Sequence, residues 1–478
     1  MTIIYASLVR VRSLLVSQWW IMAGFLFLVV ASEGVCDSGN RIVGYYASWN
    51  SANLPYDKIE YSNLTDILVA FGTPNSDGTI TYDSGIPFPQ MVESAHAAGV
   101  RVLISIGGAG SGPSFSAATT DSVQRAKLIS NIIGFLEQNH YDGVDVDWET
   151  PTNSTETLQL TDFIREMRGQ FNQTDSSWLI TMAIPASDYG GKHFDIVNLI
   201  SYVDWLNVMC YDFVGTWTSY SGHNSPLYML PSDPNQAGSD SNAVVYWISR
   251  GQGTPLQNNK LVLGIPFYSV KFNAPGLYKK VSNNVTSNPY YADDMDSLSS
   301  GWTYHWDSYS SVPYLLNKDV TEFITFEDTN SVRLKVQFAV RQNLGGVMIW
   351  ELSQGLYNGR QPLLETISST MKSLTAVEAT TRLASGYHLY DNYPNPFNPA
   401  TTIRFVLPSR SNVSLIIYDA LGREVRELTK SSLQAGSYDC VWDASRFAGG
   451  VYLCRIEAQT LGGGGRGFVD VVKLLLLK

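Results

Sequence analysis

The chain has 478 residues, which is enough for one large domain and a second, smaller one. Charged residues make up 16% and aromatic residues 12%, a balance that is typical of folded, secreted proteins and excludes a largely disordered chain. The formal net charge is −11 and there is no run of lysine and arginine, so nucleic acid is not an expected partner.

The N-terminus has the pattern of a secretory signal peptide. Arg10 and Arg12 precede an apolar run over residues 19–31, which is too short to span a bilayer but has the length of a signal's hydrophobic region. We therefore expect a signal peptide over residues 1–36, with its cleavage site left open, and no stable membrane span.

Eight strand-like segments recur before residue 355, with helical patterns between several of them. Most are continuous apolar runs, as expected of parallel strands covered on their outer side. The repetition predicts an α/β fold, a (β/α)8 TIM barrel over residues 40–370. The predicted strands are Arg41–Trp49, Leu64–Phe71, Val100–Gly107, Gly143–Glu149, Leu179–Pro185, Trp205–Tyr211, Leu261–Phe267 and Gly346–Glu351. The clearest helical patterns are Ser122–Asn139, Leu158–Phe171 and Asn330–Asn343, the last with Asp328 as its N-cap.

Residues 141–149 read Tyr-Asp-Gly-Val-Asp-Val-Asp-Trp-Glu and place three acids in the fourth predicted strand and a fourth, Asp142, just before it. Because side chains on a strand alternate, Asp145, Asp147 and Glu149 share one face, and the apolar residues between them take the other. Three carboxyl groups on one face are costly to bury unless they exchange protons or bind a ligand, so this face is expected to carry chemistry. Asp142 has the opposite parity and is interpreted as structural.

The pattern Asp-x-x-Asp-x-Asp-x-Glu resembles the signature of glycoside hydrolase family 18, the chitinases and their relatives. Three further segments are similar to family motifs in the same order along the chain. Ser105-Ile106-Gly107-Gly108 matches Ser-x-Gly-Gly at the third strand, Met209-Cys210-Tyr211-Asp212 matches Met-x-Tyr-Asp at the sixth, and Trp350 matches the tryptophan that ends the eighth. The resemblance extends over roughly residues 40–370.

The resemblance implies a hydrolase of chitin or another N-acetylglucosamine polysaccharide that retains configuration. An ordinary retaining glycosidase has a second carboxylate about 5–5.5 Å from its acid, and the motif offers none in that role. In family 18 the substrate's own N-acetyl group attacks instead. The resemblance then implies that Glu149 is the general acid/base, Asp147 orients the acetamido group, Asp145 supports Asp147, and Tyr211 donates a hydrogen bond to the acetamido oxygen. Neighbouring Asp147 is expected to raise the pKa of Glu149, and Asp145 and Asp147 are expected to titrate together.

Several further residues are candidates for substrate binding or for support of the site. Trp350 is expected to form the floor of the sugar subsite, Asp212 to contact the sugar or to steer Asp147, and Met209 to lie beside them in its motif. Tyr46, Trp217, Trp49 and Tyr268 are candidates for flanking subsites, with ordinary packing an equal alternative. Ser105, Gly107 and Gly108 are expected to serve the backbone, because glycines permit close approach of strand and loop.

The connection Lys271–Ser331 is the longest interruption of the barrel pattern. Some family members have an α+β insertion domain there that walls the groove. Here the segment is short and rich in Tyr, Ser and Asn, so we expect the insertion to be absent or reduced. A shallower, more open groove favours internal cleavage.

The composition changes after residue 371, which predicts a linker over residues 371–385 and a small all-β sandwich over residues 386–478. Its predicted strands are Thr401–Leu407, Val413–Tyr418, Tyr438–Trp442, Gly450–Ile456 and Phe468–Leu475. The proline-rich run at residues 393–402 and the segments around Asp419, Gly422 and Tyr452 resemble the C-terminal sorting domain of the bacterial type IX secretion system. That resemblance implies a bacterial protein that is secreted or attached to the cell surface and has the type IX machinery as a partner. A carbohydrate-binding or cell-wall sandwich is the alternative.

Three cysteines and the acids of the fourth predicted strand allow alternative interpretations. Cys440 and Cys454 flank a predicted hairpin and are candidates for a disulfide, whereas Cys210 reads as a buried free thiol. The acids could hold Mg²⁺ or Ca²⁺, but a strand would splay the ligands, so neither a metal nor a cofactor is expected. A non-catalytic glycan-binding barrel is a second rival, and an endo-β-N-acetylglucosaminidase acting on N-glycans is the nearest. A monomer is expected.

Overall fold

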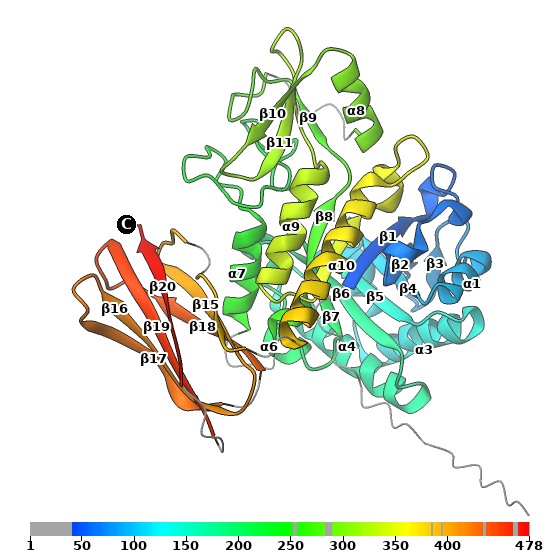
Figure 1. The fold of residues 1–478 in the computed structure, drawn as a ribbon. Helices are drawn as coiled ribbons and strands as arrows, with labels where there is room; N and C mark the ends of the chain where they lie inside the picture. The colour runs from blue at the N-terminus through cyan, green and yellow to red at the C-terminus, as the bar shows by residue number, and fades with distance from the viewer. Residues whose placement is uncertain are drawn as a thin grey trace, which may run out of the picture. The chain divides into compact units, whose positions relative to one another are not determined.

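Eight parallel strands close into a barrel surrounded by helices, as the sequence predicts (Figure 1). The structure is a computed structural model that describes residues 41–251, 256–282, 289–383, 386–392, 395–433, 436–461 and 467–477. The strand order is β1-β13-β8-β7-β6-β5-β4-β2, and pairing of β1 with β2 closes the ring. The signal peptide predicted over residues 1–36 lies outside the described residues.

Each predicted barrel strand overlaps an observed one. The barrel strands are β1 (Arg41–Ala47), β2 (Asp66–Pro74), β4 (Arg101–Gly108), β5 (Gly143–Trp148), β6 (Leu179–Pro185), β7 (Trp205–Met209), β8 (Leu261–Pro266) and β13 (Gly346–Trp350), and β3 (Ile80–Tyr82) pairs with the end of β2. Helices in this part of the chain include α1 (Pro89–Ala97), α2 (Gly112–Ala118), α3 (Ser122–Asn139), α4 (Ser154–Thr174), α5 (Asp188–Gly191), α6 (Ile196–Leu199), α7 (Asp240–Arg250), α9 (Thr329–Arg341) and α10 (Pro362–Leu383).

Side-chain alternation divides the apolar residues of the strands between two environments. Val144, Val146 and Trp148 of β5 pack outward in the large core that the strands form with the helices. A smaller cluster with Tyr45 of β1 and Trp205 of β7 fills the interior of the barrel. The inward positions of β5 are therefore left to its acids.

Helix starts follow the expected capping chemistry. The Asp121 carboxylate accepts hydrogen bonds from the backbone N–H groups of Val123 and Gln124 at 2.9 and 3.0 Å, which begins α3 at Ser122. Asp328 caps α9 in the same way and confirms the N-cap that the sequence predicts.

An α+β unit lies between β8 and α9, so the insertion is not absent, and the expectation that it is reduced stays a prediction. The unit consists of β9 (Val270–Phe272), α8 (Tyr291–Ser299), β10 (Thr303–Asp307), β11 (Val312–Leu316) and β12 (Phe323–Thr325), with strand order β10-β11-β12-β9 (Figure 1). Apolar and aromatic residues such as Phe272 and Phe323 give this sheet its own small core. An open groove no longer follows from a missing insertion, and internal cleavage of the polymer stays a prediction.

The C-terminal residues form the predicted β-sandwich. One sheet contains β14 (His388–Leu389), β15 (Ala400–Leu407) and β18 (Gly436–Asp443), and the other β16 (Ser411–Asp419), β17 (Glu424–Leu433), β19 (Gly450–Thr460) and β20 (Phe468–Leu476). Helix α10 continues to Leu383, so most of the segment 371–385 expected to be a linker is helical.

The hairpin expected between Cys440 and Cys454 is not formed. Cys440 lies on β18, which pairs with β15, and Cys454 lies on β19, which pairs with β16 and β20. The two residues therefore belong to different sheets. No disulfide joins them, and the buried Cys210 is not in a disulfide either.

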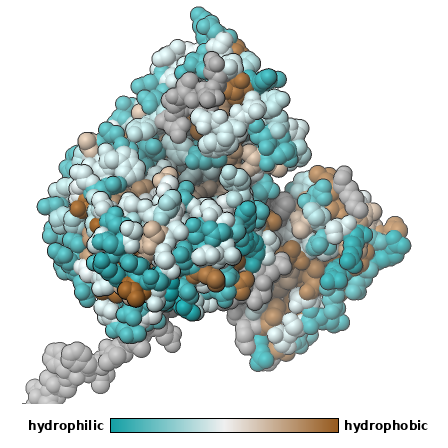
Figure 2. Space-filling view, turned by 180° about the vertical axis from the view of Figure 1, so that it is seen from behind, coloured by the Kyte–Doolittle hydropathy of each residue, from teal (hydrophilic) through white to brown (hydrophobic). Residues whose placement is uncertain are grey.

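Hydrophobic residues are scattered singly over the barrel face in Figure 2 and lie closer together on the smaller domain. Exposed apolar side chains of that domain include Val451 and Leu453 on β19 and Val469 and Val471 on β20. Within the described ranges, no helix combines the length and the apolar character needed to cross a membrane.

Candidate active site

The acids of β5 form a file that runs from the barrel interior to the strand's C-terminal end. Asp145 is fully buried, Asp147 is 3% exposed, and Glu149 follows the last strand residue and is only partly buried. The alternation places all three on the inner face, because the residues between them pack outward. Of the three acids, only Glu149 lies beyond the C-terminal end of the strand and is partly exposed to solvent.

Asp145 is held by four donors from four other strands of the barrel. Its carboxylate accepts hydrogen bonds from the Tyr45 hydroxyl at 2.7 Å, the Ser105 hydroxyl at 2.8 Å and the Thr181 hydroxyl at 2.6 Å. The Asn207 amide donates a fourth bond at 3.2 Å. Burial raises the pKa of Asp145 above its usual value, and hydrogen bonds from these groups offset only part of that rise. A carboxylate with four donors is stabilised as an anion, so we assign the charge to Asp145.

Strand register brings these donors together. Ser105 of β4 and Thr181 of β6 are the pairing neighbours of Asp145 on its two sides. Asn207 of β7 accepts a hydrogen bond from the Trp205 indole at 3.0 Å, which turns its amide N–H group toward Asp145.

Two sequence-based interpretations at this point are wrong. Tyr46 does not line the groove: it is 1% exposed, packs in the outer core and donates to the Leu54 carbonyl at 3.0 Å. Its neighbour Tyr45 has the inward parity and meets Asp145. Ser105 does not serve only the backbone, because its hydroxyl binds Asp145. Three further donors to Asp145 were missed at the level of the sequence, and these are Tyr45, Thr181 and Asn207. Each has the inward parity on a predicted strand, and that parity could have identified them.

Asp147 lies against glycine. Gly107 has φ +124°, and a Cβ there would be 2.0 Å from the Asp147 carbonyl oxygen, so a larger residue cannot occupy this position. Gly108, with φ +94°, similarly leaves room for the Phe71 ring. Among the described residues, the Asp147 Oδ1 atom has no hydrogen-bond partner. Burial, then the charges of Glu149 and Asp145, raise the pKa of Asp147 far above its usual range, which favours the protonated form.

Glu149 combines partial burial with a neighbouring negative charge. Burial raises its pKa, and the charge of Asp212 raises it further. Asp147 was the expected cause, and the two carboxyl groups do interact, since the charge of Glu149 raises the pKa of Asp147. The Ser111 hydroxyl fixes the end of the strand, because it donates to the Asp147 carbonyl at 3.1 Å and accepts from the Glu149 N–H at 3.4 Å.

The residues after β7 form a turn beside Glu149. Asp212 has φ +56°, which is unusual for a residue other than glycine. Its carboxylate accepts a hydrogen bond from the Tyr268 hydroxyl at 2.5 Å, so Tyr268 contacts the site through Asp212. The Tyr211 hydroxyl lies 4.0 Å from the Met348 sulfur, and burial raises the pKa of Tyr211, which keeps the hydroxyl a donor.

Aromatic rings gather around Trp350 at the end of β13. The Phe71 ring stacks on Trp350 at 5.8 Å, and the Tyr45 ring meets it edge-on at 5.2 Å. Trp49 is 53% exposed with its ring 6.4 Å from Trp350. Met209 packs in the same inner cluster. Trp217 is 65% exposed in the loop after β7. Exposed indole faces can stack on the apolar faces of sugars. Phe71 was missed because nothing in its sequence context marks it.

Asp142 lies at the other end of β5, away from these residues. Its carboxylate accepts hydrogen bonds from the Val102 N–H at 2.7 Å and the His96 ring at 2.8 Å, which ties the start of β5 to β4 and α1. These contacts favour the structural interpretation.

The donor set of Asp145 disfavours the metal alternative. Both of its oxygens already accept hydrogen bonds from neutral groups, so this carboxylate offers no free ligand to a cation. In the part of the chain that the structure describes, no group of three His, Cys, Asp or Glu residues has the arrangement of a metal site. The arrangement instead offers Glu149 as a proton donor at the C-terminal end of β5, with Asp147 next to it on the same face.

Comparison with known proteins gives the same picture. Residues 41–355 match the family described as glycosyl hydrolases family 18, and residues 391–462 match the secretion system C-terminal sorting domain. The chain is 25% identical over 402 residues to an endochitinase of Manduca sexta, covering 74% of this chain and 71% of that protein. It is 26% identical to probable chitinase 10 of Drosophila melanogaster, of whose length it spans only 17% against 73% of its own. The solved structure of Ostrinia furnacalis Group IV chitinase in complex with allosamidin has a TM-score of 0.63 and 26% identity, covering 70% of this chain and 99% of that one.

Proposed function

The chain belongs to glycosyl hydrolases family 18 and ends in a type IX sorting domain, and we propose that it hydrolyses β-1,4 linkages between N-acetylglucosamine units of chitin and chitooligosaccharides. The observation that carries the proposal is the file of Asp145, Asp147 and Glu149 on the inner face of β5, with Glu149 at its outer end. Active sites of barrels of this kind lie at the C-terminal ends of the strands.

Glu149 supplies the proton for the leaving oxygen. Its raised pKa keeps the carboxyl group protonated at a higher pH than an exposed glutamate would allow. After the first bond is broken, the same group, now ionised, takes a proton from the attacking water. One residue thus acts as acid and then as base.

Asp147 and Tyr211 act on the substrate's acetamido group. The acetamido oxygen attacks the anomeric carbon as the glycosidic bond breaks, and an oxazolinium ion forms, which water opens with retention of configuration. Asp147 orients the acetamido N–H, and the Tyr211 hydroxyl donates to its oxygen. Asp145, anionic and held by four donors, fixes Asp147 from behind. This route requires a 2-acetamido sugar and explains why no second carboxylate acts as a nucleophile.

The aromatic residues bind the polymer. Trp350 forms the floor for the sugar that is cleaved, with Phe71 stacked on it. Trp49 and Trp217 are exposed and stack on neighbouring sugars of the chain. Asp212 contacts the sugar or steers Asp147. Tyr268 acts through its hydrogen bond to Asp212 and not as a subsite of its own.

The C-terminal sandwich directs export. We propose that a bacterial cell sends the chain across the inner membrane by its N-terminal signal, and that the type IX machinery recognises residues 386–478 and releases or attaches the enzyme at the surface. The match of residues 391–462 to the sorting domain supports this route over a carbohydrate-binding sandwich.

Product analysis tests the substrate. The purified chain is incubated with colloidal chitin and, separately, with a high-mannose glycoprotein, and the products are identified by mass spectrometry. We expect chitobiose and short oligosaccharides from chitin and no released N-glycan. A Glu149→Gln preparation controls for contaminating enzymes. Release of whole N-glycans without chitobiose would instead identify an endo-β-N-acetylglucosaminidase.

A further inference from the structure

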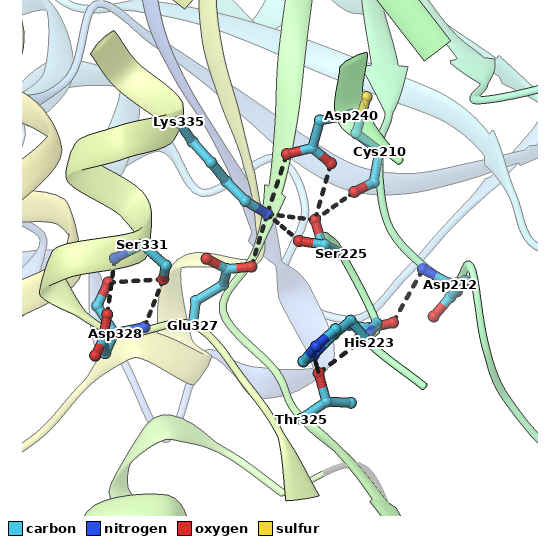
Figure 3. A network of polar contacts seen from close by, with 11 residues as sticks. Cys210, Asp212, His223, Ser225, Asp240, Thr325, Glu327, Asp328, Ser331 and Lys335 are labelled. Atoms are coloured by element: carbon cyan, nitrogen blue, oxygen red, sulfur yellow. Dashed lines mark hydrogen bonds and ion pairs between the residues drawn. The ribbon is translucent and has the colours of Figure 1, made fainter. Parts of the chain in front are cut away.

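A buried ionic cluster lies behind the end of β7, outside the proposed catalytic groups (Figure 3). It contains Lys335 of α9, Asp240 at the first turn of α7, and Glu327 between β12 and α9. All three are buried. The Lys335 ammonium lies 2.7 Å from Glu327 Oε1 and 3.2 Å from Asp240 Oδ2.

One cation and two acids make up this cluster. Burial raises the pKa of Asp240 to about 8 and also raises the pKa of Glu327, while the Lys335 ammonium lowers both. Buried ion pairs contribute little net stability compared with apolar packing, but they fix geometry, because each partner needs its specific contacts. The cluster is therefore suited to hold a neighbouring segment in one arrangement.

That segment is Asn224–Ser225. Lys335 donates to the Ser225 carbonyl at 2.6 Å and to its hydroxyl oxygen at 2.5 Å. Because this oxygen accepts from an ammonium group, its own proton points elsewhere, and it is donated to the Cys210 carbonyl at 2.5 Å. Asn224 Oδ1 accepts from the Asp212 N–H at 3.0 Å. The two residues thus bind the backbone on both sides of Tyr211.

The turn that they hold needs such support. Asp212 has a positive φ, a conformation that persists for a non-glycine residue only where its surroundings impose it. The Asn224 N–H donates to the Thr325 hydroxyl at 3.1 Å, which connects the same segment to β12. A chain of contacts therefore runs from α9 through Ser225 to the two residues that face Glu149.

We propose that Ser225, locked by the Lys335–Glu327–Asp240 cluster, is a positioning residue that holds the turn Cys210–Asp212 and so places Tyr211 and Asp212 against Glu149. The inference rests on the proposed function for its kinetic consequence. Its geometric consequence, the conformation of Asp212, does not depend on any substrate.

Serine-to-alanine variants of the full chain test the proposal. Ser225→Ala removes the hydroxyl that joins the cluster to Cys210. Ser331→Ala is the matched control, since Ser331 is also fully buried and belongs to α9, but its hydroxyl bonds with Asp328 and Glu327 at the start of the helix and not with Ser225 or with the turn Cys210–Asp212. Ser225→Thr keeps the hydroxyl and is the conservative variant. Thermal unfolding of all three shows whether each is folded.

We expect Ser225→Ala to lower kcat roughly 10- to 100-fold with KM changed little. Displaced Tyr211 and Asp212 would stabilise the transition state less well but would change binding of the ground-state substrate little. Glu149 is faced by Asp147 from β5 and by Tyr211 and Asp212 after β7, and Asp212 is faced in turn by Tyr268. Burial and the Asp212 charge raise the pKa of Glu149, so withdrawal of Asp212 lowers it. The alkaline limb of kcat/KM then moves to lower pH, and Ser225→Thr restores it. Ser331→Ala keeps the wild-type kcat and pH profile.

Crystal structures of Ser225→Ala and the wild type decide the geometry separately. We expect Asp212 to leave its positive-φ conformation in the variant. An unchanged Asp212, or an equal loss of kcat in Ser225→Ala and Ser331→Ala, would overturn the inference. A wild-type chain with no turnover of chitooligosaccharides would refute the proposed function, and the two structures would still decide the positioning.

Discussion

At the scale of single residues, the notable group is Asp145, a fully buried carboxylate that accepts hydrogen bonds from four side chains. Its four donors come from β1, β4, β6 and β7, so the closed barrel itself assembles the environment of one carboxylate. Each donor is uncharged, and together they make the anion tolerable in a site without a counter-ion.

The neighbouring tyrosines of β1 provide a matched test of this arrangement. Tyr45→Phe removes one donor to Asp145, and a buried hydrogen bond to a charged group is worth enough to change a rate roughly 10- to 100-fold. We therefore expect kcat on chitooligosaccharides to fall by that factor, as measured in initial-rate assays.

Tyr46→Phe is the control for that substitution. It removes the same hydroxyl one residue away, where the bond goes to the Leu54 carbonyl in the outer core. We expect a small fall in melting temperature and an unchanged kcat. Equal losses of activity in the two variants would contradict the assignment of Tyr45 to the site.

The residues that the sequence could predict are those with local signals. The acids of β5 and the glycines at the end of β4 lie in short motifs, and strand parity alone orders Asp145, Asp147 and Glu149. The donors of Asp145 could not be found this way, because Thr181 and Asn207 meet it only through the register of neighbouring strands. Tyr46 was chosen over Tyr45 although parity favours Tyr45, which shows that alternation has to be applied along each strand.

At the scale of elements, the regular barrel strands and the amphipathic helices follow from hydrophobic periodicity. The elements that were missed have short or polar sequences. Strand β17 (Glu424–Leu433) is an edge strand rich in charged and hydroxyl side chains, which protect an exposed edge and mask the strand pattern. The insertion sheet was misjudged by composition, because its Tyr and Ser residues read as loop while Phe272, Phe323 and Leu315 form its small cores.

The insertion also contacts loops at the C-terminal ends of the barrel strands. Tyr268 and the Tyr290–Tyr291 segment precede or begin elements of this unit, and Tyr290 receives a hydrogen bond from Asn50 at 3.3 Å. The Asn50 amide also donates to Glu351 at 3.0 Å. Contacts of this kind join the unit to the loops that follow β1 and β13. The C-terminal ends of the strands are therefore flanked by an additional layer and not left open.

At the scale of the whole molecule, the chain combines a catalytic barrel with a sandwich that matches a sorting domain. Each has its own hydrophobic core of buried residues. A separate core allows the sandwich to act as an address that the barrel does not need for its chemistry.

Deletion of residues 386–478 tests this division in a bacterium that has the type IX machinery. We expect the truncated barrel to collect in the periplasm, because the address is lost, and to hydrolyse chitooligosaccharides once it is released from the cells. Immunoblots of periplasm, cell surface and medium provide the measurement. The full-length Glu149→Gln chain is the control, since it has no activity but an intact address. Normal export of the truncated chain would contradict the assignment.

The central claim is that Glu149 is the acid and base of a folded glycosidase, and Glu149→Gln tests it most directly. Burial raises the pKa of Glu149 in the folded protein. The contribution of Glu149 to stability is therefore complete below the pKa that this residue has in the unfolded chain, and it is lost as the pH rises through its pKa in the folded protein. At pH 7 a neutral glutamine is therefore expected to leave the melting temperature unchanged or higher, while kcat on chitooligosaccharides falls roughly 100- to 10,000-fold. A well-folded Glu149→Gln protein that turns over substrate at the wild-type rate would contradict the account.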